Sequence, residues 1–349
     1  MARGTFGHCG MIVAGAITAG AFAISGCFYP SYEVVTDGAA GGGTGGTGGS
    51  DGMGGAGGAG GAGSCAPVGT EDVLACDQAN PSAIAVNFAN IYWVNEGSGE
   101  IVKMSKMDKS ITVIANNENQ PCGIALAPGA VFWRTRGGLI RKINFTPNAQ
   151  IETLKEGLGD SCALSTDGMF LYFFNTSDTE NPELFRTTLA GGPDLGLPAK
   201  PMPVGVAGQA GHIYWMEKST KKLHIAQALN PMQQTDFEVT EPCGLAGSEQ
   251  FVVVTSRIDK AVSVYANGAF VKTFTSMSAP CEAATAGGGI AWVTPSTGEV
   301  YAGAIAGNPA PKAKGPTPGC AVAIDGTDVY WTSCKSGAKT GRIMRVTVQ

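Results

Sequence analysis

The chain contains the segment Pro121-Cys122-Gly123-Ile124-Ala125-Leu126 and, six residues after it, the aromatic pair Phe132-Trp133. This arrangement recurs, and the six other copies begin at Pro81, Ser161, Pro203, Pro242, Pro280 and Gly319. Most copies reach an aromatic residue or pair at a matching distance, namely Tyr92-Trp93, Tyr172-Phe173, Tyr214-Trp215, Trp292 and Tyr330-Trp331. The fifth copy has Val252-Val253-Val254 there instead. Successive copies start 38 to 42 residues apart, so the chain is built from a regular repeat.

Each repeat is typical of four short β-strands. The opening segment is apolar and rich in small residues, as expected for an innermost strand crowded beside a central axis. The aromatic pair follows on a second strand, where large side chains fill the gap between neighbouring units. A third strand such as Ile101–Met104 and a more exposed fourth strand such as Ile111–Ile114 complete the repeat. A period of about 40 residues built from short strands predicts an all-β, seven-bladed β-propeller over residues 65–349.

The two ends of the repeat region predict how the ring closes. The seventh repeat stops after its third strand, Arg342–Arg345, and an unassigned strand, Asp72–Ala75, precedes the first repeat. We therefore expect the N-terminal strand to complete the seventh blade, which removes the free sheet edge that would otherwise template aggregation. A six-bladed ring with one degenerate repeat is the alternative.

The repeats resemble the YWTD and NHL types of β-propeller, which are known from lipoprotein-receptor ectodomains and bacterial surface proteins. Tyr330-Trp331-Thr332, with Asp325 ahead of it, carries the resemblance best, together with the Ile-Ala-Val cores of the innermost strands. No copy has the complete Tyr-Trp-Thr-Asp sequence. The resemblance implies a fold, but propellers host unrelated functions on one frame.

Composition restricts the possible partners. Only 15% of the 349 residues are charged, the formal net charge is −5, and no Lys/Arg cluster is present, which argues against a nucleic-acid partner. The ten cysteines include no Cys-x-x-Cys pair and are accompanied by only three histidines, which argues against zinc sites. This cysteine content instead predicts an oxidising compartment. We expect no metal and no cofactor, and a monomeric propeller.

The N-terminus predicts export. Arg3 and His8 precede an apolar run that ends in Ile24-Ser25-Gly26-Cys27, which resembles the bacterial lipobox. The resemblance implies a signal peptide over residues 1–26 and a membrane lipid anchor on Cys27, at the bacterial cell envelope. Phe28 after the cysteine favours the outer membrane. Ordinary signal cleavage beside an incidental cysteine is the alternative. Residues 27–64 are dominated by Gly, Ala, Thr and Ser and predict a flexible tether.

Five cysteines share one place in the repeat, at the start of an innermost strand, and should ring the mouth of the channel: Cys122, Cys162, Cys243, Cys281 and Cys320. Three interpretations compete, namely buried small hydrophobes, disulfides between adjacent blades, and thiolate metal ligands. For the ring closure we expect a Cys76–Cys334 disulfide, with Cys65–Cys76 as the main competitor.

The turns between second and third strands should lie on the same face as these cysteines. They supply the candidate residues for binding a partner: Glu96, Arg134, Arg136, Asp178, Glu180, Glu217, Lys218, Arg257, Asp259, Lys335 and Lys339. Solvated loop residues are the simpler interpretation. A mixed-charge collar around the channel, where propellers often bind partners, is the functional one.

Three function hypotheses follow. The first is a membrane-anchored, non-enzymatic propeller that binds a protein or glycan. The second is a metal-dependent lyase or lactonase, which needs His, Asp or Glu converging on the channel, where the innermost strands offer only Glu282 and Asp325. His212 and His224 are expected at the surface or between blades. The third is a periplasmic scaffold of an outer-membrane assembly complex. We favour the first and expect no enzymatic activity.

Overall fold

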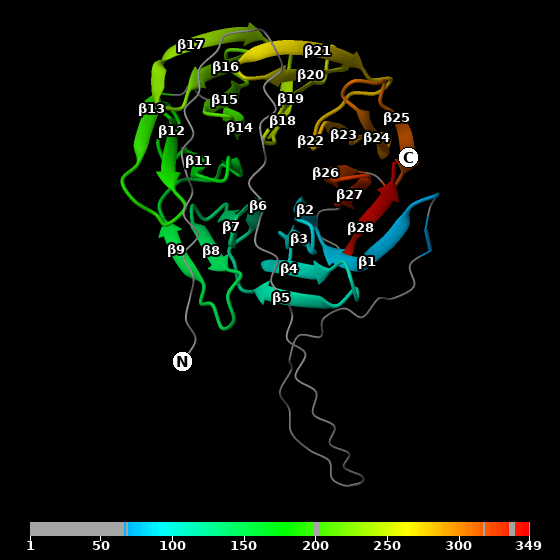
Figure 1. Cartoon of the computed structure of the whole chain (residues 1–349). Helices are drawn as coiled ribbons and strands as arrows, with labels where there is room; N and C mark the ends of the chain where they lie inside the picture. Colours follow the sequence, from blue (N-terminus) through cyan, green and yellow to red (C-terminus); the bar gives the residue numbers. More distant parts are fainter. Residues whose placement is uncertain (1–65, 68, 199–202, 317, 335–338, 349) are drawn as a thin grey trace, which may run out of the picture. The chain divides into compact units, whose positions relative to one another are not determined.

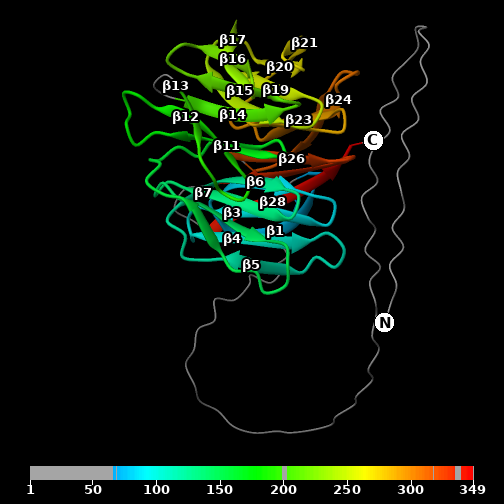
Figure 2. The ribbon, with the colours of Figure 1, turned by 60° about the vertical axis from the view of Figure 1, so that its left-hand side comes forward.

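The computed structural model describes residues 66–348 except 68, 199–202, 317 and 335–338. The expected signal peptide and tether, with Cys27, lie outside these described residues. In the described part of the chain, 28 strands form seven antiparallel four-stranded sheets. Figure 1 shows the sheets arranged as blades around a common centre, and Figure 2 shows them in an oblique view. The predicted seven-bladed β-propeller is confirmed, and the six-bladed alternative is wrong.

The blades follow one another along the chain, each with its innermost strand first. Blade 1 consists of β2 (Pro81–Val86), β3 (Asn90–Asn95), β4 (Glu100–Ser105) and β5 (Ile111–Ala115). Blade 2 consists of β6 (Pro121–Ala127), β7 (Ala130–Thr135), β8 (Ile140–Asn144) and β9 (Glu152–Lys155). Blade 3 consists of β10 (Leu164–Thr166), β11 (Phe170–Asn175), β12 (Glu183–Thr188) and β13 (Leu195–Pro198). Blade 4 consists of β14 (Pro203–Gln209), β15 (His212–Glu217), β16 (Lys222–Gln227) and β17 (Asn230–Glu238).

The remaining three blades complete the ring. Blade 5 consists of β18 (Pro242–Gly247), β19 (Val252–Ser256), β20 (Ala261–Ala266) and β21 (Ala269–Thr275). Blade 6 consists of β22 (Ala283–Ala286), β23 (Gly289–Thr294), β24 (Glu299–Ala304) and β25 (Ala310–Lys314). Blade 7 consists of β26 (Gly319–Asp325), β27 (Asp328–Ser333), β28 (Lys339–Thr347) and β1 (Asp72–Ala79).

The N-terminal strand closes the ring as predicted. β1 pairs antiparallel with β28, with Asp72 opposite Arg345 and Ala79 opposite Lys339, and the two strands lie side by side in Figure 1. The Arg345 guanidinium is ion-paired with the Asp72 carboxylate across this seam. The observed strand extends four residues beyond the predicted Asp72–Ala75.

The core lies between blades, where the second strands meet. Buried side chains of the described residues form seven clusters, each drawn from two neighbouring blades. Trp93, Trp133, Trp292 and Trp331 are fully buried in these gaps, as the repeat predicts. In the fifth copy, the three valines of β19 are buried as well. Within the described residues, no helix is long and apolar enough to cross a membrane.

Candidate functional site

One face of the ring, called here the top face, carries both the turns between second and third strands and the connections from each fourth strand to the next blade. The backbone joins these two kinds of loop within a blade. Arg136 N donates to Gln120 O at 3.0 Å, and Cys334 N donates to Pro318 O at 3.1 Å. The opening cysteines of the innermost strands lie at this same end of each blade. The top face therefore surrounds one mouth of the channel, as the sequence predicts.

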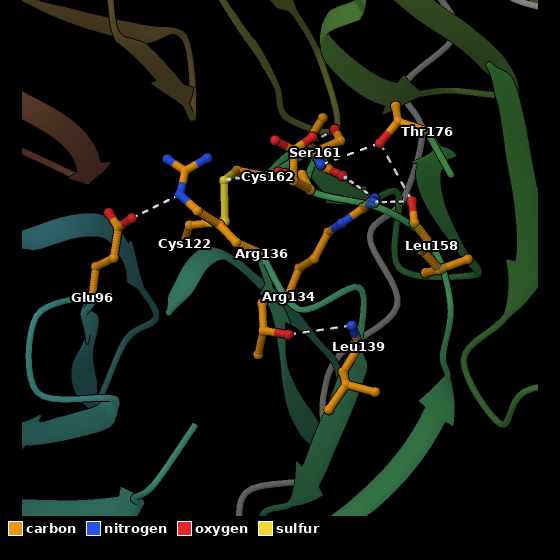
Figure 3. The surroundings of a disulfide bond; sticks show 12 residues. Glu96, Cys122, Arg134, Arg136, Leu139, Leu158, Ser161, Cys162 and Thr176 are labelled. Atoms are coloured by element: carbon orange, nitrogen blue, oxygen red, sulfur yellow. Dashed lines mark hydrogen bonds and ion pairs between the residues drawn. A yellow bond between two sulfur atoms is a disulfide. The ribbon is translucent and has the colours of Figure 1, made fainter. Parts of the chain in front are cut away.

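Four of the top-face cysteines join neighbouring blades. Cys122 on β6 is bonded to Cys162 before β10, with Cα atoms 5.3 Å apart, and this links blade 2 to blade 3 (Figure 3). Cys243 on β18 is bonded to Cys281 before β22, with Cα atoms 4.9 Å apart, and this links blade 5 to blade 6. Of the three interpretations of these cysteines, the interblade disulfide is confirmed.

The predicted Cys76–Cys334 disulfide is wrong, because Cys334 is bonded to Cys320 with Cα atoms 5.8 Å apart. In the antiparallel pairing of β26 with β27, Gly319 lies opposite Ser333, and Cys320 is the extra residue at the register shift before Ala321. Cys334 directly follows Ser333, so both cysteines lie at the top-face end of this strand pair. Cys76 lies on β1, and β28 separates it from β27. Cys76 is itself disulfide-bonded, and the alternative partner Cys65 lies outside the described residues.

An ion pair connects the turns of blades 1 and 2 on the top face. Arg136 Nε donates to Glu96 Oε1 at 2.7 Å (Figure 3). Glu96 also accepts a bond from Asn80 Nδ2 at 3.3 Å. Arg136 is exposed and Glu96 is half-buried. The sequence prediction placed both residues on this face, and the structure brings them together.

Arg134, by contrast, is no surface residue. It lies on β7, whose residues are all buried, and its side chain is fully inaccessible. Its guanidinium donates to the backbone carbonyl of Leu158 at 3.2 Å and that of Ala163 at 3.4 Å, both in the blade 2 to blade 3 connection (Figure 3). Burial lowers the pKa of Arg134 to about 10, although the nearby Asp160 charge opposes the shift. The prediction that Arg134 is available to a partner is wrong. Its hydrogen bonds instead connect blade 2 to the segment that leads into blade 3.

Several predicted top-face residues are exposed at the tips of their turns: Asp178, Glu180, Lys218, Arg257 and Asp259. The Asp178 carboxylate accepts hydrogen bonds from the backbone of Glu180 at 3.0 Å and of Asn181 at 3.1 Å, which shape the blade 3 turn. Lys335 lies outside the described residues, and Lys339 begins β28 with a side chain that is not described.

Glu217 is buried beneath the top face with His224, and it is therefore unavailable to a large partner. His224 Nε2 lies 3.2 Å from Glu217 Oε2, and His224 Nδ1 lies 2.8 Å from Asp236 Oδ1. Its ring stacks on Trp215 with centroids 5.0 Å apart. Burial disfavours the imidazolium, but the hydrogen bonds and charges of the two carboxylates outweigh burial and raise the pKa of His224. The sequence predicts His224 at the surface or between blades; the residue lies on the third strand β16 but is buried, so the surface position is wrong.

We expect this cluster to make stability depend on pH. Because the folded pKa of His224 is raised above 6.5, its contribution is fully present below pH 6.5 and is lost as pH rises through the folded pKa. Urea unfolding of the wild type and of His224→Gln across this pH range should give a difference in free energy that shrinks as pH rises. His212→Gln, on the other face, serves as the control, and parallel curves for wild type and His224→Gln would contradict the prediction.

The opposite face carries the most exposed apolar side chains. Phe88 is 93% exposed and Met107 is 94% exposed, both in turns of blade 1. The corresponding turns of blades 2, 3 and 4 add Phe145, Met169 and Leu229. Sequence reasoning missed this concentration, although the register of the repeats places all five residues in turns of that face. The top face carries two further exposed apolar side chains, Ile258 at 64% and Met277 at 82%. Exposed apolar side chains can mark an interaction surface, so any binding test has to compare both faces.

Comparisons with known proteins place the chain by fold only. No protein-family profile matches the sequence, and no curated protein matches it. The structure is similar to virginiamycin B lyase from Staphylococcus aureus, with a TM-score of 0.64, 14% identity, and coverage of 80% of this chain and 99% of that one. It is also similar to a streptogramin B lyase, with a TM-score of 0.64, 11% identity, and coverage of 80% of this chain and 97% of that one. The WD40 propeller domain of Doa1 is similar as well, with a TM-score of 0.61, 11% identity, and coverage of 79% of this chain and 97% of that one. At such identities the likeness shows a β-propeller and nothing about activity.

Proposed function

We propose that this protein is a lipid-anchored, non-enzymatic binding protein of the bacterial cell envelope. In this proposal the Cys27 lipid and the glycine-rich tether hold a monomeric propeller at the outer membrane. The propeller binds a protein or glycan partner through the exposed turns of its top face. The closed ring supports a monomer, because the edge strands of the described blades are the innermost strands, which face the channel, and the outermost strands at the rim.

The main support for the proposal is that disulfides link neighbouring blades on the top face. Disulfides link blade 2 to blade 3 and blade 5 to blade 6 next to the channel mouth. A rigid frame that presents variable turns is the usual architecture of a binding surface. Fixed turns also lose less conformational entropy when a partner binds. The disulfides further support export, because such bonds persist in oxidising compartments and are rare in the cytosol.

The exposed charges on this face are unevenly distributed. The blade 3 turn carries Asp178 and Glu180, whereas the turns of blades 4 and 5 carry Lys218 and Arg257 together with one carboxylate, Asp259. Opposite charges at separate places on a rigid face would orient a partner with complementary charges and speed its association. We expect the affinity for the partner to fall as ionic strength rises.

Affinity capture from envelope extract tests the role of the top face. The full-length wild type is compared with two charge variants, Asp178→Asn with Glu180→Gln and Lys218→Gln with Arg257→Gln. All four side chains are exposed, and an asparagine side-chain oxygen at position 178 can still accept the backbone bonds of the blade 3 turn, so the variants should keep wild-type stability within about 1 kcal/mol. We expect a partner retained by the wild type to be lost, or bound about tenfold more weakly, by at least one variant.

The matched control is Phe88→Ser with Met107→Ser, which removes two apolar tips from the opposite face. The proposal requires this variant to bind the partner as well as the wild type does. Loss of binding in the control, together with full binding in both charge variants, would place the partner on the opposite face and contradict the proposal.

The anchor has a separate test. Metabolic labelling with an alkyne fatty acid in a bacterial host should label the wild type, and Cys27→Ala should carry no label and leave the membrane fraction. Label that persists in Cys27→Ala would contradict lipidation at this residue. Protease shaving of intact cells then separates a surface-exposed propeller from the periplasmic scaffold, since an inward-facing domain survives the protease.

A further inference from the structure

The central channel contains a cavity of about 400 Å³, lined by the innermost strands of all seven blades. Its wall consists mostly of small and aliphatic side chains such as Ala85, Ile124 and Val322. Among the lining residues, Glu282 is the only one that carries a charge, because the lining cysteines are in disulfides. The cavity wall is therefore polar as well as aliphatic, because serine and threonine residues and the backbone of the innermost edge strands contribute to it, and it contains a single acidic side chain.

Glu282 departs from the repeat at a position where the other copies are nearly uniform. It is the third residue of the opening segment, directly after the cysteine. The same position in the other six copies holds only alanine or glycine: Ala83, Gly123, Ala163, Gly205, Gly244 and Ala321. A small residue is therefore the rule at this position, and packing of the innermost strand gives no reason for a carboxylate. A charged side chain at this place calls for another explanation.

The carboxylate of Glu282 has no hydrogen bond or ion pair within the described residues. The strands packed against this part of blade 6 are β18, β19, β23 and β26. Of these strands only β26 carries a titratable side chain, Asp325, at its far end, where it is ion-paired with Lys106. Burial raises the pKa of Glu282 to about 7. An ionised carboxylate that is only partly accessible and has no partner is unfavourable until a cation reaches it.

A second polar group of the channel wall is also without a partner. Ser82 on β2 lines the cavity, and its buried hydroxyl has no hydrogen-bond partner in the described structure. It occupies the second position of its opening segment, so it lies toward the same mouth of the channel as Glu282. Native proteins rarely leave such groups unsatisfied.

We propose that the channel binds a small organic cation, whose ammonium group pairs with Glu282 and whose short hydrocarbon part contacts aliphatic side chains of the lining such as Ile124 and Val322. The volume is that of an ordinary small-ligand pocket. A divalent metal fits less well, because such ions take several oxygen ligands and no group of three or more His, Cys, Asp or Glu suited to a metal occurs among the described residues. This site lies inside the channel and is independent of the exposed turns proposed to bind a macromolecular partner.

The test measures the binding of n-butylammonium chloride to the full-length protein. Binding is monitored by NMR in an amine-free phosphate buffer near pH 8, where Glu282 is ionised. We expect saturable binding to the wild type, about tenfold or more weaker binding to Glu282→Gln, and weak binding of the neutral analogue n-butanol. Glu249→Gln, an exposed carboxylate on the opposite face, is the matched control and should bind as the wild type does. Near pH 6 the wild-type affinity should fall about tenfold, because the carboxyl group is then mostly protonated.

Glu282→Ala provides a second variant, because it installs a residue that three other copies carry at this position and should therefore fold. Equal binding of n-butylammonium by the wild type and both Glu282 variants would overturn the proposal. Equal binding of n-butanol and n-butylammonium would do so as well, since it would assign the cavity to apolar ligands. Tighter, Glu282-dependent binding of Ca²⁺ or Mg²⁺ would reassign the site to a metal.

Discussion

Replacing Cys122 and Cys162 together by alanine is expected to lower the free energy of unfolding by about 4 kcal/mol. The bond joins residues 40 apart in the sequence, and the chain-entropy model assigns about this value to a loop of that length. The loss should appear as a lower guanidinium midpoint. Amide exchange should become faster mainly in blades 2 and 3, because this disulfide connects their innermost strands.

The disulfide within blade 7 provides the comparison. Cys320 and Cys334 are only 14 residues apart, and the same model gives about 3 kcal/mol for the paired alanine variant. Its effect on exchange should stay within blade 7, because the bond connects no other blade. Free thiols at Cys122 or Cys162 in the unreduced native protein would contradict the interblade bond. Unchanged stability of the double variant would contradict the bracing role.

The ring itself could be predicted from sequence because its physical cause is local and repeated. Each copy needs a small residue beside the axis and a large one between blades, and the fixed period places these requirements at regular positions. The closing strand could be predicted as well, since a blade lacking its fourth strand leaves an unpaired edge. β19 shows why one atypical copy did not change the count: its valines fill the same buried positions as the aromatic pairs elsewhere.

The cysteine pairing and the place of Arg134 were harder to predict, for physical reasons. Cys320 has the same repeat position as Cys122 but bonds within its own blade, because a cysteine follows β27 there and no corresponding residue follows β7. Arg134 lies on a second strand, which is covered on both faces by neighbouring blades. On such a strand the residues do not alternate between a buried and an exposed face, because both faces are covered. A charged residue on it is therefore easily taken for a loop residue.

Glycine at the third position of the opening segment explains how two blades approach closely enough for an interblade disulfide. A Cβ on Gly244 would lie well under 3.0 Å from the carbonyl oxygen of Cys281, and a Cβ on Gly123 would be similarly close to that of Cys162. Five copies begin no interblade disulfide, and at this position one holds glycine (Gly205), one holds glutamate (Glu282) and three hold alanine: Ala83, Ala163 and Ala321. Both copies that begin such a disulfide therefore have the glycine that the close approach requires.

Gly244→Ala is accordingly expected to cost about 3 kcal/mol or more, because the clash is with backbone and no rotamer change relieves it. Gly205→Ala is the matched control. The nearest atom to its Cβ would be Leu245 Cβ at 3.0 Å, and the backbone atoms of Leu245 would lie at ordinary contact distance, so it should cost clearly less. In a Cys243→Ala, Cys281→Ala background, blades 5 and 6 can separate slightly, and the cost of Gly244→Ala should fall by about 1 kcal/mol or more. If Gly244→Ala has the same cost in free energy of unfolding with and without the disulfide, the close approach of the two strands does not depend on that bond.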